Sequence, residues 1–207
     1  DKQLIKHGES FAELSAQACG RYGKMEIYAK ITESGREFYL NGNKITRNAD
    51  ILGNLFSVFF SPQELRLIQD GPDERRRFLN VSISQLSRTY FTALNRYNKV
   101  LEQRNNLLKN RDLALIYDTL PVWDLQLCKY AAIVAFKRAE YIDKLAPLAA
   151  QAHSYLTDGG EELKISPDKN YVGTEEELAK RLFDELSNGY DRDIRLGYTA
   201  CGPHRDD

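Results

Sequence analysis

The chain has 207 residues, a formal net charge of −1, and hydrophobic and charged fractions of 42% and 29%. This composition argues against an intrinsically disordered chain, and the length suffices for one or two domains with a hydrophobic core. The sequence has no apolar run long enough to cross a membrane and does not open with a signal peptide, so we expect a soluble protein without a membrane partner.

Charge is distributed unevenly along the chain. Residues 71–111 contain nine Lys or Arg against three Asp or Glu, whereas residues 155–193 contain five Lys or Arg against eleven Asp or Glu. The basic segment is a candidate for binding an anionic partner such as nucleic acid, because net positive charge attracts phosphates.

The cysteines and histidines do not form a disulfide or metal-binding pattern. They are widely separated: Cys19, Cys128, Cys201, His7, His153 and His204. An odd number of distant cysteines fits buried free thiols in a reducing compartment, so we expect a cytoplasmic protein. No two histidines have the spacing of a helical metal site, and we expect no bound metal.

The beginning of the chain is predicted to form a small antiparallel sheet. Residues 25–31 alternate apolar and polar side chains, as a half-buried strand does, and residues 37–40 are the return strand after a turn at residues 34–35. A second turn signal, Asn-Gly-Asn, precedes another short strand within residues 41–46. The apolar run at residues 55–60 predicts one further, buried strand.

Two long amphipathic helices are predicted next. Residues 70–74 have turn residues, a proline for the first helical position, and acids for the first turn. Apolar side chains then recur at helical spacing in two seams: Leu86, Tyr90, Leu94, Tyr97, Leu101 and Leu108, then Leu120, Trp123, Leu127, Tyr130, Val134, Tyr141, Leu145 and Leu148. A short link at residues 110–121 makes the helices antiparallel, and at about 1.5 Å per residue they form an arm of roughly 30 to 45 Å.

The end of the chain is expected to contain a strand at residues 162–165 and a further helix. Thr174 precedes three glutamates, which is typical of an N-cap followed by first-turn acids. This helix is expected to end at residues 187–189, where the sequence is Ser-Asn-Gly. The chain thus has three expected parts: a β-rich portion of a head domain at residues 1–70, a helical arm at residues 71–157, and a return into the head domain at residues 158–207.

The sequence lacks the short motifs of several enzyme classes. It contains no G-x-x-x-x-G-K-[ST] loop to cradle phosphates, no G-x-G-x-x-G and no G-x-S-x-G. We therefore expect no catalytic residue and no enzyme activity for this chain alone.

The basic residues of the predicted arm are candidate DNA contacts. They are Arg75, Arg76, Arg77, Arg88, Arg96, Lys99, Arg104 and Lys109, with Arg111 at the end of the segment. Guanidinium groups bind phosphates, and a basic face on a projecting hairpin suits a duplex whatever its sequence. Two alternatives stay open. The three consecutive arginines can instead form an internal salt-bridge cluster with nearby acids, and the other cations can be the solvated face of an amphipathic helix.

Residues 202–207, with the sequence Gly-Pro-His-Arg-Asp-Asp, are dense in ionisable groups. His204 and Arg205 can donate charge-assisted hydrogen bonds to a phosphate. Asp206 and Asp207 can hold Arg205 in place or lie near a magnesium ion. A solvated loop at the end of a strand is the competing interpretation, because charge clusters commonly face water.

Five segments carry recognisable patterns in a consistent order. Residues 58–65 (VFFSPQEL) and 71–79 (GPDERRRFL) are similar to an FxPxDL…GxPxxRRxFLD stretch, and residues 90–109 are similar to a helix with YNRVLxQRNxLLK. Residues 123–127 (WDLQL) match WDxQL, and residues 197–207 match GxT…GPHRDD. Together these segments resemble the RecF family of SMC-like ATPases, and the resemblance covers the whole chain.

The resemblance implies an α+β fold, namely the small antiparallel β portion of an ABC/SMC-type ATPase head with an inserted helical-hairpin arm. It also implies a Walker A loop ahead of residue 1, and signature and Walker B motifs after residue 207, so that the chain is a central fragment. Such a fragment binds no cofactor itself, whereas ATP and Mg²⁺ are expected for the full-length protein. Asn80 stands where the family usually has Asp.

By the same resemblance, the whole protein acts in recombinational DNA repair. It binds double-stranded DNA and single-strand/double-strand junctions, forms an ATP-dependent homodimer, and works with RecO and RecR to load recombinase. The resemblance places six residues on the nucleotide side of the head: Ser61, Glu64, His204, Arg205, Asp206 and Asp207. Two alternatives stay open: the arm is chiefly a docking module for a repair partner such as RecR, or the chain comes from another SMC-like ATPase.

Overall fold

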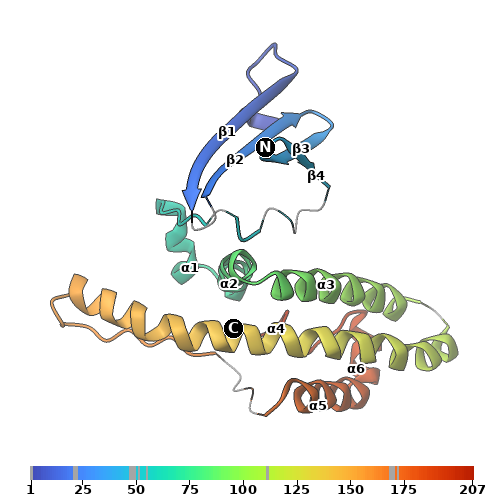
Figure 1. The fold of residues 1–207 in the computed structure, drawn as a ribbon. Coiled ribbons are helices and arrows are strands. Elements are labelled where there is room, and N and C mark those ends of the chain that lie inside the picture. Colours follow the sequence, from blue (N-terminus) through green and yellow to red (C-terminus); the bar gives the residue numbers. More distant parts are fainter. Residues whose placement is uncertain are drawn as a thin grey trace. The chain divides into compact units, whose positions relative to one another are not determined.

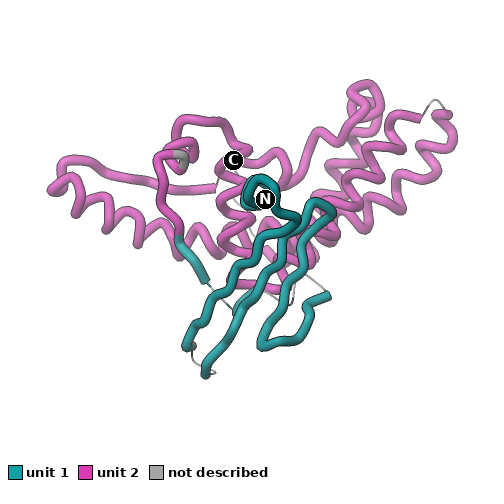
Figure 2. The backbone as a smooth tube through the Cα atoms, turned by 90° about the horizontal axis from the view of Figure 1, so that it is seen from above, with its two compact units in different colours: residues 1–58 teal, residues 59–207 magenta. Residues whose placement is uncertain are grey.

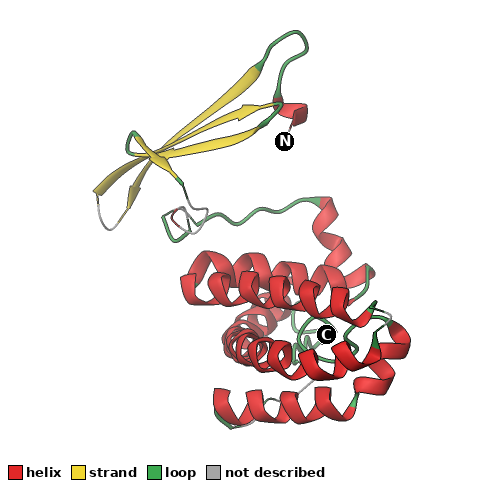
Figure 3. Cartoon of the chain, turned by 90° about the vertical axis from the view of Figure 1, so that its right-hand side faces the viewer, coloured by secondary structure: helices red, strands yellow, loops and turns green. Residues whose placement is uncertain are grey.

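The computed structural model, shown in Figure 1, describes a chain of two compact units. Its described residues are 2–20, 23–46, 50, 52–54, 56–110, 112–167, 171 and 173–207. The units are Asp1–Val58 and Phe59–Asp207 (Figure 2). All strands of the described residues lie in the first unit, whereas the second consists of helices and loops (Figure 3). A small antiparallel sheet and a helical hairpin were both expected, and both are present.

The first unit is a four-stranded antiparallel meander in the order β1-β2-β3-β4. A short 3-10 helix precedes the strands, so that the elements are η1 (Lys2–Leu4), β1 (Phe11–Gly20), β2 (Gly23–Thr32), β3 (Gly35–Leu40) and β4 (Asn43–Ile45). The strands β2, β3 and β4 lie where alternation and turn signals predict them. β1 was not predicted.

The alternation of β2 separates a buried face from a half-buried one. Ala29 and Ile31 are the buried residues of the strand. On the other face of the strand, Tyr28 lies opposite Tyr39 of β3, with ring centroids 5.5 Å apart. The Tyr28 hydroxyl donates to a carboxylate oxygen of Glu13 in β1 at 2.6 Å. Cross-strand pairs of this kind stabilise a sheet and fix its register.

Two predicted strands are wrong. Residues 56–60 have no regular secondary structure, and Phe56, Val58, Phe59 and Phe60 are exposed; Leu55 lies outside the described residues. Residues 162–165 also have no regular secondary structure. An apolar run becomes a strand only if a partner strand offers backbone hydrogen bonds, and neither segment has such a partner among the described residues.

The described residues of the second unit form one 3-10 helix and six α-helices: η3 (Pro62–Leu65), α1 (Arg66–Gln69), α2 (Pro72–Leu86), α3 (Arg88–Leu108), α4 (Leu113–Leu156), α5 (Glu175–Asn188) and α6 (Tyr190–Leu196). Two predicted helix starts are confirmed. Pro72 occupies the first turn of α2, which also contains two acids, and Thr174 forms a capping box with Glu177 at the start of α5.

The predicted hairpin differs from the structure at two points. The first helix is broken at Ser87, whose side chain caps α3 by accepting from the Tyr90 amide at 3.2 Å. The link is shorter than predicted, because α4 begins at Leu113 and continues through Pro121. A proline removes one helical hydrogen bond, but here the neighbouring Leu120 is fully buried and holds the helix in the core.

The main hydrophobic core lies between α3, α4 and α5. Tyr90, Ala93, Tyr97 and Val100 of α3 pack with small and apolar residues of α4 and with the leucines of α5: Leu127, Cys128, Ala131, Ala132, Val134, Ala135, Leu178, Leu182 and Leu186. The alanines of α4 bring neighbouring helices close. The predicted seams are therefore confirmed in their central parts, while Leu86 and Leu148 at their ends are each 64% exposed.

A buried ionic cluster joins α3, α4, α6 and the loop that follows. Arg104, Asp124 and Asp193 are all 0% exposed. The Arg104 Nε donates to Asp124 Oδ1 at 2.6 Å, and its Nη1 donates to Asp193 Oδ2 at 2.8 Å and to the Thr199 hydroxyl at 2.9 Å. Burial opposes the charge of the guanidinium, but hydrogen bonds and charges from the two aspartates outweigh it and raise the pKa of Arg104.

The loop after α6 is held by the same cluster. The amide and hydroxyl of Thr199 both donate to Asn105 Oδ1 at 2.8 Å, and the Ala200 amide donates to Asp193 Oδ1 at 3.2 Å. Asn105 and Arg104 are adjacent in α3, so one turn of this helix fixes where the chain leaves α6. These contacts fix the start of the segment of residues 199–207.

We predict that Arg104→Met lowers the unfolding free energy of the helical unit by about 3–5 kcal/mol, because Asp124 is then buried without a counterion and Asp193 keeps only its 3.3 Å contact with Arg192. Urea denaturation followed by the fluorescence of Trp123, the single tryptophan, measures this loss. Arg96→Met removes an exposed guanidinium from the same helix and should cost at most about 0.5 kcal/mol. If Arg104→Met lowered the unfolding free energy no more than this control does, Arg104 would not be the buried counterion that stabilises the helical unit.

Candidate functional site

His204 is held between α3 and the backbone of its own loop. The Tyr97 hydroxyl lies 2.5 Å from His204 Nδ1, and the Thr199 carbonyl oxygen lies 3.0 Å from Nε2. Since a carbonyl can only accept, Nε2 carries the proton and Nδ1 accepts from the Tyr97 hydroxyl. Burial lowers the pKa of His204 below its usual value, which favours this neutral form. Both ring nitrogens are therefore occupied within the protein.

Gly202 permits the close approach of this loop to α3. Its φ is +119°, a conformation that L side chains rarely adopt, and a Cβ there would lie 2.9 Å from the Tyr97 hydroxyl oxygen. Any other residue would displace the loop or the tyrosine.

Arg138 of α4 holds the adjacent residue of the loop. Its Nη1 donates to the Pro203 carbonyl at 2.5 Å and its Nη2 to Asn80 Oδ1 at 2.9 Å. The Tyr90 hydroxyl accepts from Arg138 Nε at 3.1 Å and donates to Asn80 Oδ1 at 2.6 Å. Asn80 thus supplies the acceptor oxygen without a negative charge.

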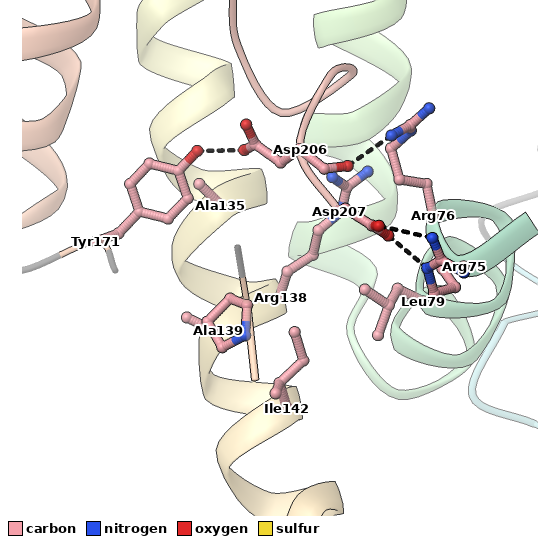
Figure 4. A pocket seen from close by; sticks show the side chains of 11 residues that line it. Arg75, Arg76, Leu79, Ala135, Arg138, Ala139, Ile142, Tyr171, Asp206 and Asp207 are labelled. Carbon is pink, nitrogen blue, oxygen red and sulfur yellow. Dashed lines mark hydrogen bonds and ion pairs between the residues drawn. The ribbon is translucent and has the colours of Figure 1, made fainter. Parts of the chain in front are cut away.

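Two arginines of α2 hold Asp206 and Asp207. Arg75 donates from Nε and Nη2 to the two carboxylate oxygens of Asp207, the latter at 2.6 Å, and this hydrogen bonding lowers the pKa of Asp207 (Figure 4). Arg76 Nη1 donates to the backbone carbonyl of Asp206 at 2.6 Å, while the Tyr171 hydroxyl donates to its carboxylate. α2 and the loop are therefore joined by charged and backbone contacts.

A small cavity lies beside these contacts (Figure 4). Its volume is about 30 Å³. Pockets for ligands of nucleotide size measure roughly 300 to 1,000 Å³, so this cavity does not hold a nucleotide. It is lined by Arg75, Arg76, Leu79, Ala135, Arg138, Ala139, Ile142, Pro167, Tyr171, Asp206 and Asp207.

The six nucleotide-side candidates fall into two groups. His204, Arg205, Asp206 and Asp207 lie in one loop, in which Arg205 is exposed and lies over the Tyr198 ring at 4.8 Å from its centroid. Ser61 is half-buried and Glu64 is exposed in η3. Among the described residues no hydrogen bond joins Ser61 or Glu64 directly to this loop. Their role near a nucleotide stays a prediction.

The predicted DNA contacts also divide by exposure. Arg104 is fully buried, so its prediction as a DNA contact is wrong. Arg75 and Arg76 are half-buried and bonded to the loop, which agrees with the alternative of internal ion pairs. The exposed members are Arg77, Arg88, Arg96, Lys99 and Lys109, while Arg111 lies outside the described residues.

Two cysteines are buried free thiols, as expected, but Cys19 is exposed. Burial raises the pKa of Cys128 to about 12 and that of Cys201 to about 11, so both stay protonated. In the part of the chain that the structure describes, no three His, Cys, Asp or Glu residues gather as a metal site. None of the helices described there is long and apolar enough to span a membrane.

No protein-family model matches the chain. The DNA replication and repair protein RecF of Lachnospira eligens is 35% identical over 216 residues, which cover 100% of this chain and 56% of that protein. RecF of Halothermothrix orenii is 36% identical over 214 residues, with coverage of 100% and 57%. The chain is related to RecF along its whole length. It spans only about 56% of the length of the Lachnospira eligens RecF.

Solved structures of RecF agree with this relationship. The recombination mediator protein RecF of the RecFOR pathway, described as RecF-ATP, superposes with a TM-score of 0.88 at 28% identity. The form described as RecF-ATPrS gives 0.87 at 26% identity, and both comparisons cover 100% of this chain and 57% of the other. The predicted resemblance and the predicted fold class, an α+β part of an ABC/SMC-type ATPase head, are confirmed.

We predict that His204 makes the stability of the helical unit depend on pH. An unfolded imidazole binds its proton near pH 6.5, whereas the folded one binds it only at lower pH. The unfolded state therefore takes up more protons as the pH falls below about 6.5, and stability that is present above this pH is lost through the window beneath it. Urea midpoints measured by Trp123 fluorescence at a series of pH values should show this decline.

The control is the other histidine of the same unit. His204→Gln should remove the part of the decline that begins just below pH 6.5, whereas His153→Gln should leave it in place. The loss at lower pH from carboxylates with a lowered pKa, such as that of Asp207, stays in both variants. An unchanged decline in His204→Gln would show that another group titrates.

Proposed function

We propose that this chain is the arm-bearing part of a RecF-type DNA repair ATPase, in which the exposed cations of α3 bind the phosphate backbone of duplex DNA. The relationship to RecF supports the repair role. The whole protein then binds ATP with Mg²⁺, dimerises with ATP, and acts with RecO and RecR at gapped or junction DNA. This chain supplies no catalytic residue to that activity.

The observation that carries the DNA proposal is the face of α3 on which its cations lie. At about 100° per residue, Arg88, Arg96 and Lys99 fall within roughly a quarter of the helix circumference. Tyr90 and Tyr97 point to the opposite side, into the core. The cations are thus directed away from the core along one helix, as a contact to successive phosphates requires.

Three of the exposed cations lie on α3 or at its C-cap: Arg96, Lys99 and Lys109. Among the described residues, no carboxylate lies within ion-pair distance of Arg96, Lys99 or Lys109. By contrast, Arg75 and Arg104 donate to internal carboxylates. Phosphate contacts position a protein on a duplex without reading its sequence, so we expect binding that depends on salt and little on sequence.

A second candidate function is protein docking by the arm. Leu115, Val122 and Leu125 of α4 are 46%, 58% and 64% exposed. Their spacing of seven and three residues places them near one face of the helix. Such a row favours contact with a repair partner such as RecR, with DNA bound elsewhere.

We predict that the combined variant Arg96→Gln, Lys99→Gln, Lys109→Gln weakens duplex binding by the native protein. The slope of log affinity against log salt should become shallower by about 0.9 for each lost phosphate contact. Fluorescence anisotropy of a labelled duplex between about 50 and 200 mM salt measures both quantities.

The matched control removes the same charge away from α3, in the variant Lys144→Gln, Lys164→Gln, Lys180→Gln. All three of these lysines are exposed. Equal effects of the two variants would attribute binding to net charge alone. Unchanged DNA affinity in the α3 variant, together with loss of RecR capture in Leu115→Ser, Val122→Ser, Leu125→Ser, would favour docking instead.

A further inference from the structure

Arg75 contacts two segments that are far apart in the sequence. On one side, its Nη1 donates to the carbonyls of Asp70 at 3.1 Å and Leu67 at 3.4 Å, at the end of α1. On the other side, its Nε and Nη2 donate to the carboxylate of Asp207. One guanidinium therefore joins residues 61–70 to residues 202–207.

The two segments are anchored to different degrees. Residues 202–207 are held by buried contacts, since Pro203 accepts from Arg138 and His204 bonds to Tyr97. The helix α1 contains no buried residue, and most of η3 is exposed. The bonds from Arg75 thus attach a weakly packed segment to a well-held loop.

We propose that Arg75, oriented by Asp207, is a positioning residue that fixes residues 61–70 against the helical unit. The inference rests on the proposed function in one respect: these two segments carry the six residues assigned to the nucleotide side. Asp207 binds the Nε/Nη2 edge of the guanidinium with its two carboxylate oxygens and leaves Nη1 directed at the carbonyls of Leu67 and Asp70. Displacement of Asp207 then releases residues 61–70.

The chemistry requires arginine at this position. A guanidinium donates in a fixed planar fork and can satisfy a carboxylate and two carbonyls at once, whereas a lysine ammonium is a single point charge. The neighbouring Arg77 provides the contrast. Its side chain is 75% exposed, and among the residues that the structure describes it donates only to Glu74 in the same helix, at 3.3 Å.

Hydrogen exchange in the native protein tests the coupling. The amides of Glu64 and Asp70 bond to carbonyls within the segment, at 2.9 Å and 2.8 Å, and report on its order. Arg75→Lys and Asp207→Asn should each speed exchange across residues 61–70 by about tenfold. The double variant should add little more, because the two residues act through one contact. Arg77→Lys is the matched control and should leave exchange unchanged.

A kinetic measurement on the full-length protein gives a readout that loss of stability alone would not produce. Arg75→Lys should raise the KM for ATP by about tenfold while kcat changes little, and Arg77→Lys should change neither. Absence of ATP turnover in the unaltered protein would refute the proposed function, and hydrogen exchange would still decide the coupling. If Arg75→Lys speeds hydrogen exchange across residues 61–70 but leaves the KM for ATP unchanged, neither segment contributes to nucleotide binding. Unchanged exchange in Arg75→Lys, or additive effects in the double variant, would overturn the inference.

Discussion

A guanidinium that has no contact with solvent must find its counter-charge inside the protein, and Arg104 finds two aspartates that lie on different helices. Asp124 belongs to α4 and Asp193 to α6, so charge neutralisation is possible only when α3, α4 and α6 adopt this arrangement. Removing one member leaves a buried charge, which is more costly than loss of an ordinary contact. The cluster and the hydrophobic core therefore both restrict how these helices can pack.

The loop of residues 199–207 is placed by a chain of contacts that starts at this cluster. Arg104 and Asn105 bind Thr199, and the carbonyl of Thr199 accepts from His204. Arg75 and Arg76 then hold the two aspartates that follow. A loop rich in charge is thus fixed by neutral and ionic bonds to three helices, and His204, Asp206 and Asp207 all make contacts within the protein. The outward cations of α3 are separated from this network because they lie on the opposite face of the same helix.

The sequence predicted the elements that have local signals. Turn residues located β3 and β4. A first-turn proline and acids located the start of α2, a capping threonine located that of α5, and helical periodicity located the central parts of both seams. β1 was missed because Phe11–Gly20 alternates weakly, and Leu14 within it is 51% exposed. The run at residues 56–60 was misassigned because apolar composition does not reveal whether a partner strand exists.

The site was less predictable, because its contacts join residues far apart in the sequence. Arg75 and Asp207 are separated by 132 positions, and no spacing rule relates them. Arg104, however, carried a usable signal. It follows Tyr97 by seven residues and Val100 by four, which places it on the buried seam of α3. A charged residue at a seam position indicates a buried ion pair. This signal predicts that Arg104 does not contact DNA.

Nitrogen-15 NMR of the arginine side chains in the native protein tests the central claim most directly. The Nε–H of Arg104, assigned by its loss in Arg104→Lys, should exchange with water much more slowly than that of Arg96, because it is bonded to Asp124 and shielded from solvent. An Arg104 Nε–H that exchanges as fast as that of Arg96 would show that the guanidinium is open to water, and the proposed organisation of the helical unit would be wrong.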